Sequence, residues 1–129
     1  MTDPIADMII RLKNACMAER KDLVLPHSRV KEDIVKILKE NQYIEDYQLI
    51  EKKPQNEIKI ILRYVNKLSV ITDVKRVSKP GRRVYVKASD IPQTLNGYGL
   101  TILSSNRGII DDKKARKEKV GGEILCQIW

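Results

Sequence analysis

The chain has 129 residues, of which 42% are hydrophobic and 33% are charged, and its formal net charge is +8 at pH 7. This length suits one compact domain or two small ones, and the apolar content is sufficient for a modest core, which argues against a disordered chain. No apolar run is long enough to cross a bilayer, and the amino-terminal residues do not resemble a signal peptide. We therefore expect a soluble intracellular protein.

The positive charge is concentrated in the second half of the chain. Residues 1–65 contain 12 Lys and Arg against 11 Asp and Glu, whereas residues 66–129 contain 13 against 6. The two halves thus carry net charges of +1 and +7. Because clustered cations bind phosphates by displacing condensed counterions, this asymmetry favours a nucleic-acid partner. A lysine-rich, solvated surface would give the same counts.

The first half of the chain is predicted to fold as an α-β-α-β-β module. Asp3 and Pro4 are suited to begin a helix, and Ser28 is suited to cap a second helix that ends near residue 41. Residues 22–26 are predicted to form a short buried strand between the two helices. Two further strands, over 43–51 and 57–65, are separated by the turn formers of 52–56 and should pair as a hairpin.

The second helix is expected to be amphipathic. Its predicted apolar stripe consists of Val30, Ile34, Ile37 and Leu38. Its predicted solvent face consists of Lys31, Glu32, Lys36 and Lys39. A short polar break follows the first module at 66–69, where the charge balance changes, and it separates the expected domains 1–65 and 66–129.

The second half is predicted to be mostly β structure with short helices. Its expected elements are strands over 70–78 and 82–88 joined by a turn at 78–81, a helix from Ser89 or Asp90 to Gly97, a strand over 100–105, a tight turn over 106–108 leading to a further short strand, a helix over 112–119 capped by Asp111 or Asp112, and a final strand over 121–129. The fold class is therefore α+β, with two small α/β domains.

The sequence does not support a catalytic, metal or cofactor site. Its one histidine, His27, lies in a predicted turn, where a surface role is more common than general-base catalysis. Asp111 and Asp112 are explained by helix capping. Cys16 and Cys126 lie far apart without other ligands at metal-binding spacing, so both are expected to be reduced core thiols. Glycine-rich phosphate loops are absent, and no small-molecule substrate is implied.

A strongly basic segment runs from Lys75 to Lys87 without an acidic residue. Its cations are Lys75, Arg76, Lys79, Arg82, Arg83 and Lys87. Strand alternation would place Arg83, Tyr85 and Lys87 on one face, where cations can contact phosphates and the ring can contact a base or ribose. The alternative is an ordinary strand with Tyr85 turned toward the core, and the pattern alone does not decide between them.

A cluster of hydrogen-bonding side chains follows at residues 104–107. Ser104, Ser105, Asn106 and Arg107 could bond to bases, ribose hydroxyls and phosphates. The same residue types are also favoured in any tight turn. By itself the cluster favours a turn without a binding role.

Several segments together resemble the small-subunit ribosomal protein S8 family over nearly the whole chain. They are TDPIADMIIRLKNA, SRVKEDIVKILKENQYI, RVSKPGRRVYVKASDIP, GYGLTILSSNRGIIDD and VGGEILCQIW, in this order. The resemblance implies two domains packed against one another and a non-catalytic protein of the ribosome, in the cytoplasm or in an organelle. It implies binding to an irregular helix in the central domain of small-subunit rRNA, assembly of the platform and body beside neighbouring ribosomal proteins, and repression of its own operon mRNA in many bacteria.

The resemblance also assigns site residues. The family's signature turn, usually Ser-Thr-Ser, falls on Ser104, Ser105 and Asn106, which favours the binding interpretation of that turn over the structural one. Tyr85 takes an RNA-facing tyrosine position. The remaining assignments are Gly121, Gly122 and Glu123, whose glycines would let backbone N–H groups approach RNA, and the first-helix residues Lys13 and Asn14.

Two departures from the family pattern affect this surface. The second and third signature residues are Ser and Asn, and Glu118-Lys119 stands where the family usually has Leu-Gly, which calls for another helix C-cap.

Two rival functions are a DNA-binding regulator, for which no helix shows base-reading side chains, and an RNA-modifying enzyme, for which no cofactor loop is found.

Overall fold

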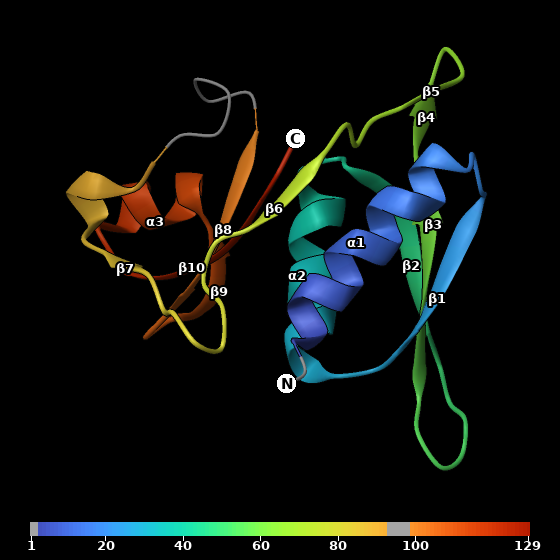
Figure 1. The fold of residues 1–129 in the computed structure, drawn as a ribbon, viewed down its shortest axis with the longest axis horizontal. Coiled ribbons are helices and arrows are strands. Elements are labelled where there is room, and N and C mark those ends of the chain that lie inside the picture. Colours follow the sequence, from blue (N-terminus) through green and yellow to red (C-terminus); the bar gives the residue numbers. More distant parts are fainter. Residues whose placement is uncertain (1–2, 93–98) are drawn as a thin grey trace. The chain divides into compact units, whose positions relative to one another are not determined.

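The computed structural model describes residues 3–92 and 99–129 and has a mixed α+β fold, as the sequence predicts (Figure 1). Its contacts divide the chain into two compact units. One unit is Ile10–Thr72, and the other combines the residues up to Ile9 with those from Asp73 onward. The predicted helix that ends at Gly97 lies mostly outside the described residues; within them, a single 3-10 turn, η1 (Ala88–Asp90), opens this segment.

The elements of the first half confirm the predicted α-β-α-β-β order. They are α1 (Pro4–Met17), β1 (Asp22–Pro26), α2 (Arg29–Glu40), β2 (Ile44–Ile50) and β3 (Glu57–Leu62). The strands form an antiparallel sheet in the order β1-β3-β2. Both predicted N-caps are present, because the Ala6 amide donates to Asp3 Oδ1 at 3.2 Å and the Lys31 amide donates to Ser28 Oγ at 3.2 Å.

Three expectations for this half are wrong. Strand β1 lies at the edge of the sheet, and Leu25 is its one buried residue, so it is not a buried strand. Val30 is 40% exposed, whereas Lys31 is buried and its ammonium group donates to the Pro26 carbonyl at 3.2 Å. In the first turn of α2, Lys31 thus lies against the protein, because the Pro26 carbonyl oxygen compensates the charge of its ammonium group.

The predicted break at 66–69 is a hairpin turn. Strands β4 (Tyr64–Val65) and β5 (Leu68–Ser69) pair directly, and Asn66 and Lys67 between them both have positive φ, at 53° and 67°. Two consecutive left-handed residues are typical of the two-residue turn that matches the twist of paired strands. The predicted strand over 57–65 is correspondingly divided into β3 and β4.

The second unit is built around its last strand. Its strands are β6 (Val74–Arg76), β7 (Tyr85–Val86), β8 (Leu100–Ser105), β9 (Gly108–Asp111) and β10 (Gly122–Ile128). Strand β8 pairs with one edge of β10, and β6 and β7 follow one another along its other edge. The hairpin of β8 and β9 leads into α3 (Asp112–Glu118), whose N-cap is Asp111.

The strands expected over 70–78 and 82–88 are much shorter than predicted. Between them, the side chain of Ser78 is fully buried, and its hydroxyl accepts a hydrogen bond from the Val84 amide at 2.8 Å. A side chain therefore satisfies backbone groups that a longer ladder would have paired. Lys79 and Arg82 close the predicted turn with two reciprocal backbone hydrogen bonds of 2.9 Å.

The second unit has a compact apolar core. Leu103, Ile110, Ala115 and Ile124 are buried together with Ile91. Half-buried valines from the basic segment, Val77, Val84 and Val86, pack against this cluster. These contacts hold β7, β8, β10 and α3 in fixed relation.

Arg76 has a structural role and is wrongly counted among the cations of the basic surface. Its side chain is 9% exposed, it pairs with Asp3 at 3.0 Å between Nε and Oδ2, and it donates to the Leu125 carbonyl.

The two cysteines are buried and free, as predicted. Among the described residues, no helix is long and apolar enough to cross a membrane.

Candidate nucleic-acid interface

Three side chains from different strands lie in one row across the second sheet. Glu123 of β10 is the register partner of Tyr85 on β7 and of Ser104 on β8. Partners in register project from the same face of a sheet, so the three side chains are neighbours. Long-range pairing thus joins three segments that are up to 38 positions apart in sequence.

The tyrosine of this row faces solvent. Tyr85 is 70% exposed, and Arg83 and Lys87 are exposed as well, whereas Val84 and Val86 are half-buried. The predicted alternation is therefore confirmed, and the alternative that placed Tyr85 on the core side is wrong. An aromatic ring held outward on a strand is available for stacking on an unpaired base.

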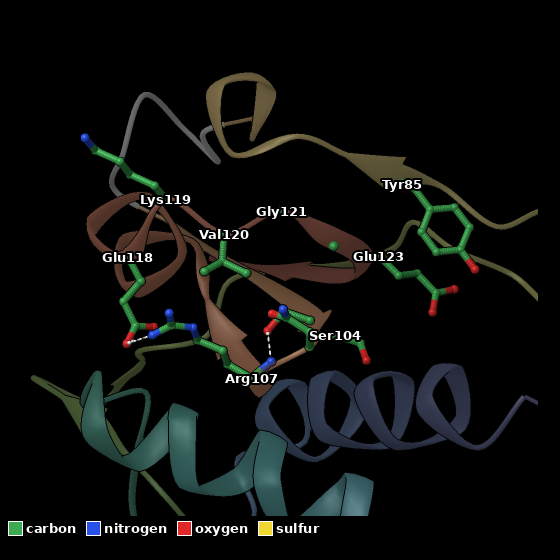
Figure 2. A pocket seen from close by; sticks show the side chains of 11 residues that line it. Tyr85, Ser104, Arg107, Glu118, Lys119, Val120, Gly121 and Glu123 are labelled. Carbon is green, nitrogen blue, oxygen red and sulfur yellow. Dashed lines mark hydrogen bonds and ion pairs between the residues drawn. The ribbon is translucent and has the colours of Figure 1, made fainter.

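The row lies in a depression of about 500 Å³ (Figure 2). Its lining residues are Tyr85, the turn residues Ser104, Ser105, Asn106 and Arg107, and the segment Glu118, Lys119, Val120, Gly121, Gly122 and Glu123. The structure thus brings together eight of the residues that the sequence assigned to RNA binding. Val120 was missed, and Glu118 and Lys119 were noticed only as departures; their position directly before the two glycines was the available signal.

The turn residues have different tasks. The Ser105 hydroxyl donates to the Gly108 carbonyl at 2.9 Å and accepts from the Arg107 amide at 3.1 Å, so it builds the turn. Gly108 adopts a φ of 95°, which favours glycine. Within the described ranges, the side chains of Ser104 and Asn106 form no hydrogen bond, which leaves them available to a ligand.

Two arginines beside the depression are held in ion pairs. Arg107 Nη1 lies 3.4 Å from Glu118 Oε1, and Arg83 Nη1 lies 3.2 Å from Glu123 Oε2. Each arginine is about half exposed, and each glutamate lines the depression. The local surface is therefore less positive than the net charge of +7 on residues 66–129 suggests.

The two glycines let the strands approach closely. A Cβ at Gly121 would collide with the Val86 carbonyl oxygen and lie 2.9 Å from Lys87 Cα. A Cβ at Gly122 would collide with the Ser104 carbonyl oxygen. The structure therefore gives these glycines a packing role, in addition to the predicted backbone access for RNA.

The other predicted cations lie outside this depression. Lys79 and Arg82 are exposed on either side of the tight turn at Pro80 and Gly81. Lys87 lines a second depression of about 440 Å³ with Ala88, Ser89, Arg116 and Lys119. Lys119 lines both depressions.

The two residues assigned from the first helix belong to the other compact unit. Lys13 is half-buried and Asn14 is exposed on α1, in the Ile10–Thr72 unit. The structure does not bring them into the depression. Their assignment to RNA binding stays a prediction.

The remaining candidates for chemistry have structural explanations. The His27 ring lies 2.8 Å from Glu32 Oε1, next to the cap of α2. Hydrogen bonds from His27 and from Lys36 lower the pKa of Glu32. In the parts of the chain that the structure describes, no three His, Cys, Asp or Glu side chains are grouped so that they could hold a metal ion.

The chain is similar to known proteins over nearly its whole length. The chain matches the family described as ribosomal protein S8 over residues 3–129. Proteins called small ribosomal subunit protein uS8 are 51% identical in Halothermothrix orenii, 50% in Dictyoglomus thermophilum and 48% in Oceanobacillus iheyensis. Each alignment covers 100% of this chain and 98% of the relative. The chain therefore belongs to the ribosomal protein S8 family.

Proposed function

We propose that this protein is a structural constituent of the small ribosomal subunit and binds the central domain of its rRNA through the depression described above. The observation that carries the proposal is the convergence of Tyr85, Ser104, Asn106 and the two-glycine turn on one open surface. The similarity to uS8 proteins over the full chain supports the ribosomal role. An mRNA element of the same shape would compete for the same surface.

The side chains of the depression suit an irregular RNA better than a regular duplex. The exposed Tyr85 ring can stack on an unpaired base, and the Ser104 hydroxyl and Asn106 amide can bond to base edges and ribose hydroxyls. Because these groups are uncharged, they contribute selectivity more than general attraction. The open shape of the depression admits a splayed base without a large rearrangement of the strands.

The exposed cations outside the depression supply the general attraction. Lys79 and Arg82 protrude from a tight turn, where long side chains can follow a phosphate backbone without fixed geometry. We expect most of the affinity to reside in the predicted domain 66–129, because its net charge is +7. Assembly of the platform and body would follow from the order that such binding imposes on the rRNA.

The test compares two double variants on a central-domain rRNA fragment and a scrambled fragment. Ser104→Ala with Asn106→Ala should lose about 1–3 kcal/mol of binding to the central-domain fragment for each well-formed contact and change scrambled binding little. Lys79→Ala with Arg82→Ala should weaken both RNAs about equally and reduce the salt slope by roughly 0.7–0.9 for each contact. A Ser104/Asn106 variant that keeps the full preference would contradict the proposal.

A further inference from the structure

The ion pair between Arg107 and Glu118 lies at the rim of the depression and is weakly built. A single contact of 3.4 Å joins Arg107 Nη1 to Glu118 Oε1, and the arginine is 57% exposed (Figure 2). Such partly exposed, single-contact pairs contribute little to stability and open easily. The pair is therefore available for competition with a ligand.

The second carboxylate oxygen makes the pair less favourable. Glu118 Oε2 is shielded from solvent and has no hydrogen-bond partner among the residues that the structure describes, although the side chain as a whole is 28% exposed. A shielded carboxylate oxygen without a donor costs free energy, because it has lost water without a replacement. Packing alone does not explain why an acid should occupy this position.

An acid at this position has a direct effect on anions. Arg107 is the cation of the turn that carries Ser104 and Asn106, so a phosphate that approaches this turn in the depression would meet it; Lys119 lines the same depression. While the pair is closed, Glu118 neutralises Arg107 and cancels most of its attraction for the phosphate. The ligand must break or share the Arg107 pair before it gains any attraction from it.

We propose that Glu118 is a selectivity-determining residue, which holds Arg107 in an ion pair and so penalises RNA that binds through its phosphates alone. The inference rests on the proposed function. Non-cognate RNA gains only electrostatic attraction here and bears the whole penalty. Cognate RNA is held by its contacts with the turn and Tyr85 and can leave the Arg107 pair closed, so it does not bear the full penalty. Selectivity is thus improved by weakening the wrong complex.

The test uses the full chain with Glu118→Gln, which keeps the shape and removes the charge. The matched control is Glu45→Gln, which removes the same charge from a partly exposed Arg63–Glu45 pair of 3.7 Å in the other compact unit. Dissociation constants are measured for central-domain and scrambled fragments at several salt concentrations. Circular dichroism and thermal unfolding report on the fold of each variant, and Glu118→Leu serves as a second uncharged variant.

We expect Glu118→Gln to tighten binding of the scrambled fragment about two- to five-fold and to raise its salt slope by roughly 0.7–0.9, as for one added phosphate contact. Binding of the central-domain fragment should change by less than the scrambled fragment, so the ratio of the two affinities falls. Glu45→Gln should leave the ratio unchanged. In an Arg107→Gln background, Glu118→Gln should lose its effect, because the acid acts through that arginine.

Equal gains from Glu118→Gln and Glu45→Gln would overturn the inference, since net charge alone would then account for them. An effect that persists without Arg107 would overturn it as well. A wild type that prefers the central-domain fragment, with a ratio that Glu118→Gln does not change, leaves the proposed function standing and rejects the role of Glu118. A wild type without any preference overturns the proposed function and this inference together.

Discussion

Replacing Gly122 with alanine tests whether close strand approach shapes the depression. A Cβ at this position would collide with the Ser104 carbonyl oxygen and lie 3.0 Å from Ser104 C and 3.1 Å from Ser105 Cα. All three atoms belong to the backbone of β8, so no side-chain rotation relieves the contact. Strands β8 and β10 must separate locally, directly beneath the turn that carries Asn106.

The expected loss of stability follows from the cost of overpacking. Forced backbone shifts in a packed region cost about 1–3 kcal/mol, and we expect Gly122→Ala to lie in that range. Gly81→Ala is the matched control, because a Cβ at Gly81 would meet no atom within 4 Å. That variant should be within about 1 kcal/mol of the wild type and could gain from a less flexible unfolded chain.

Urea unfolding followed by the fluorescence of Trp129 is the direct assay, since this single tryptophan follows β10 in the second unit. Gly122→Ala should also reduce the preference for the central-domain fragment, because the distance between Ser104 and Glu123 changes. If Gly122→Ala and Gly81→Ala unfold at the same urea concentration, the close approach of the two strands has no energetic consequence and the packing argument is refuted.

Three further outcomes follow from the second unit and the two thiols. Burial of Asp3 opposes its ionisation, but hydrogen bonds from Arg76 and backbone amides outweigh this and lower its pKa below 3.8. The ionised Asp3 carboxylate therefore stabilises the fold above about pH 4. The free energy of unfolding should fall as the pH drops through the lowered pKa of Asp3, and Asp3→Asn should remove this fall. Lys119 ends α3 with a φ of 55°, so Lys119→Gly should raise the free energy of unfolding by up to about 1 kcal/mol, measured in urea, while it weakens binding of all RNAs. Burial raises the pKa of Cys126 to about 12 and also raises that of Cys16, so neither thiol should react with a disulfide reagent at pH 8 until the protein unfolds; rapid labelling of the folded protein would contradict their burial.

Local signals in the sequence predicted the elements well. The cap at Ser28, and the cap at Asp111 as one of two neighbouring candidates, were predicted because a capping residue and its helix are adjacent in the chain. Lys31 and Arg76 were misplaced because their charges are compensated by partners that no local pattern specifies, the Pro26 carbonyl and Asp3. Periodicity reports which face a residue occupies on an ideal element, but it does not report which polar atom lies opposite it.

The candidate site was predicted in parts. The family resemblance pointed to Tyr85 and the turn at Ser104, and the fold adds that both are register partners of Glu123. That register depends on the pairing of β7 and β8 with opposite edges of β10, which a single sequence does not specify. The Ser105 hydroxyl, which the resemblance assigns to RNA, also bonds to Gly108 and Arg107 within its own turn, and its role in RNA binding stays a prediction.

The most direct test of the central claim is to map the RNA-binding surface by amide chemical shifts. The ¹⁵N-labelled full chain is titrated with the central-domain rRNA fragment and, separately, with the scrambled fragment. The RNA-binding role of the depression predicts that the central-domain fragment shifts the amides of Tyr85, Ser104 to Arg107 and Gly121 to Glu123 most strongly, and that the scrambled fragment mainly shifts residues near Lys79 and Arg82. Strongest shifts within Ile10–Thr72, or the same pattern for both fragments, would contradict it.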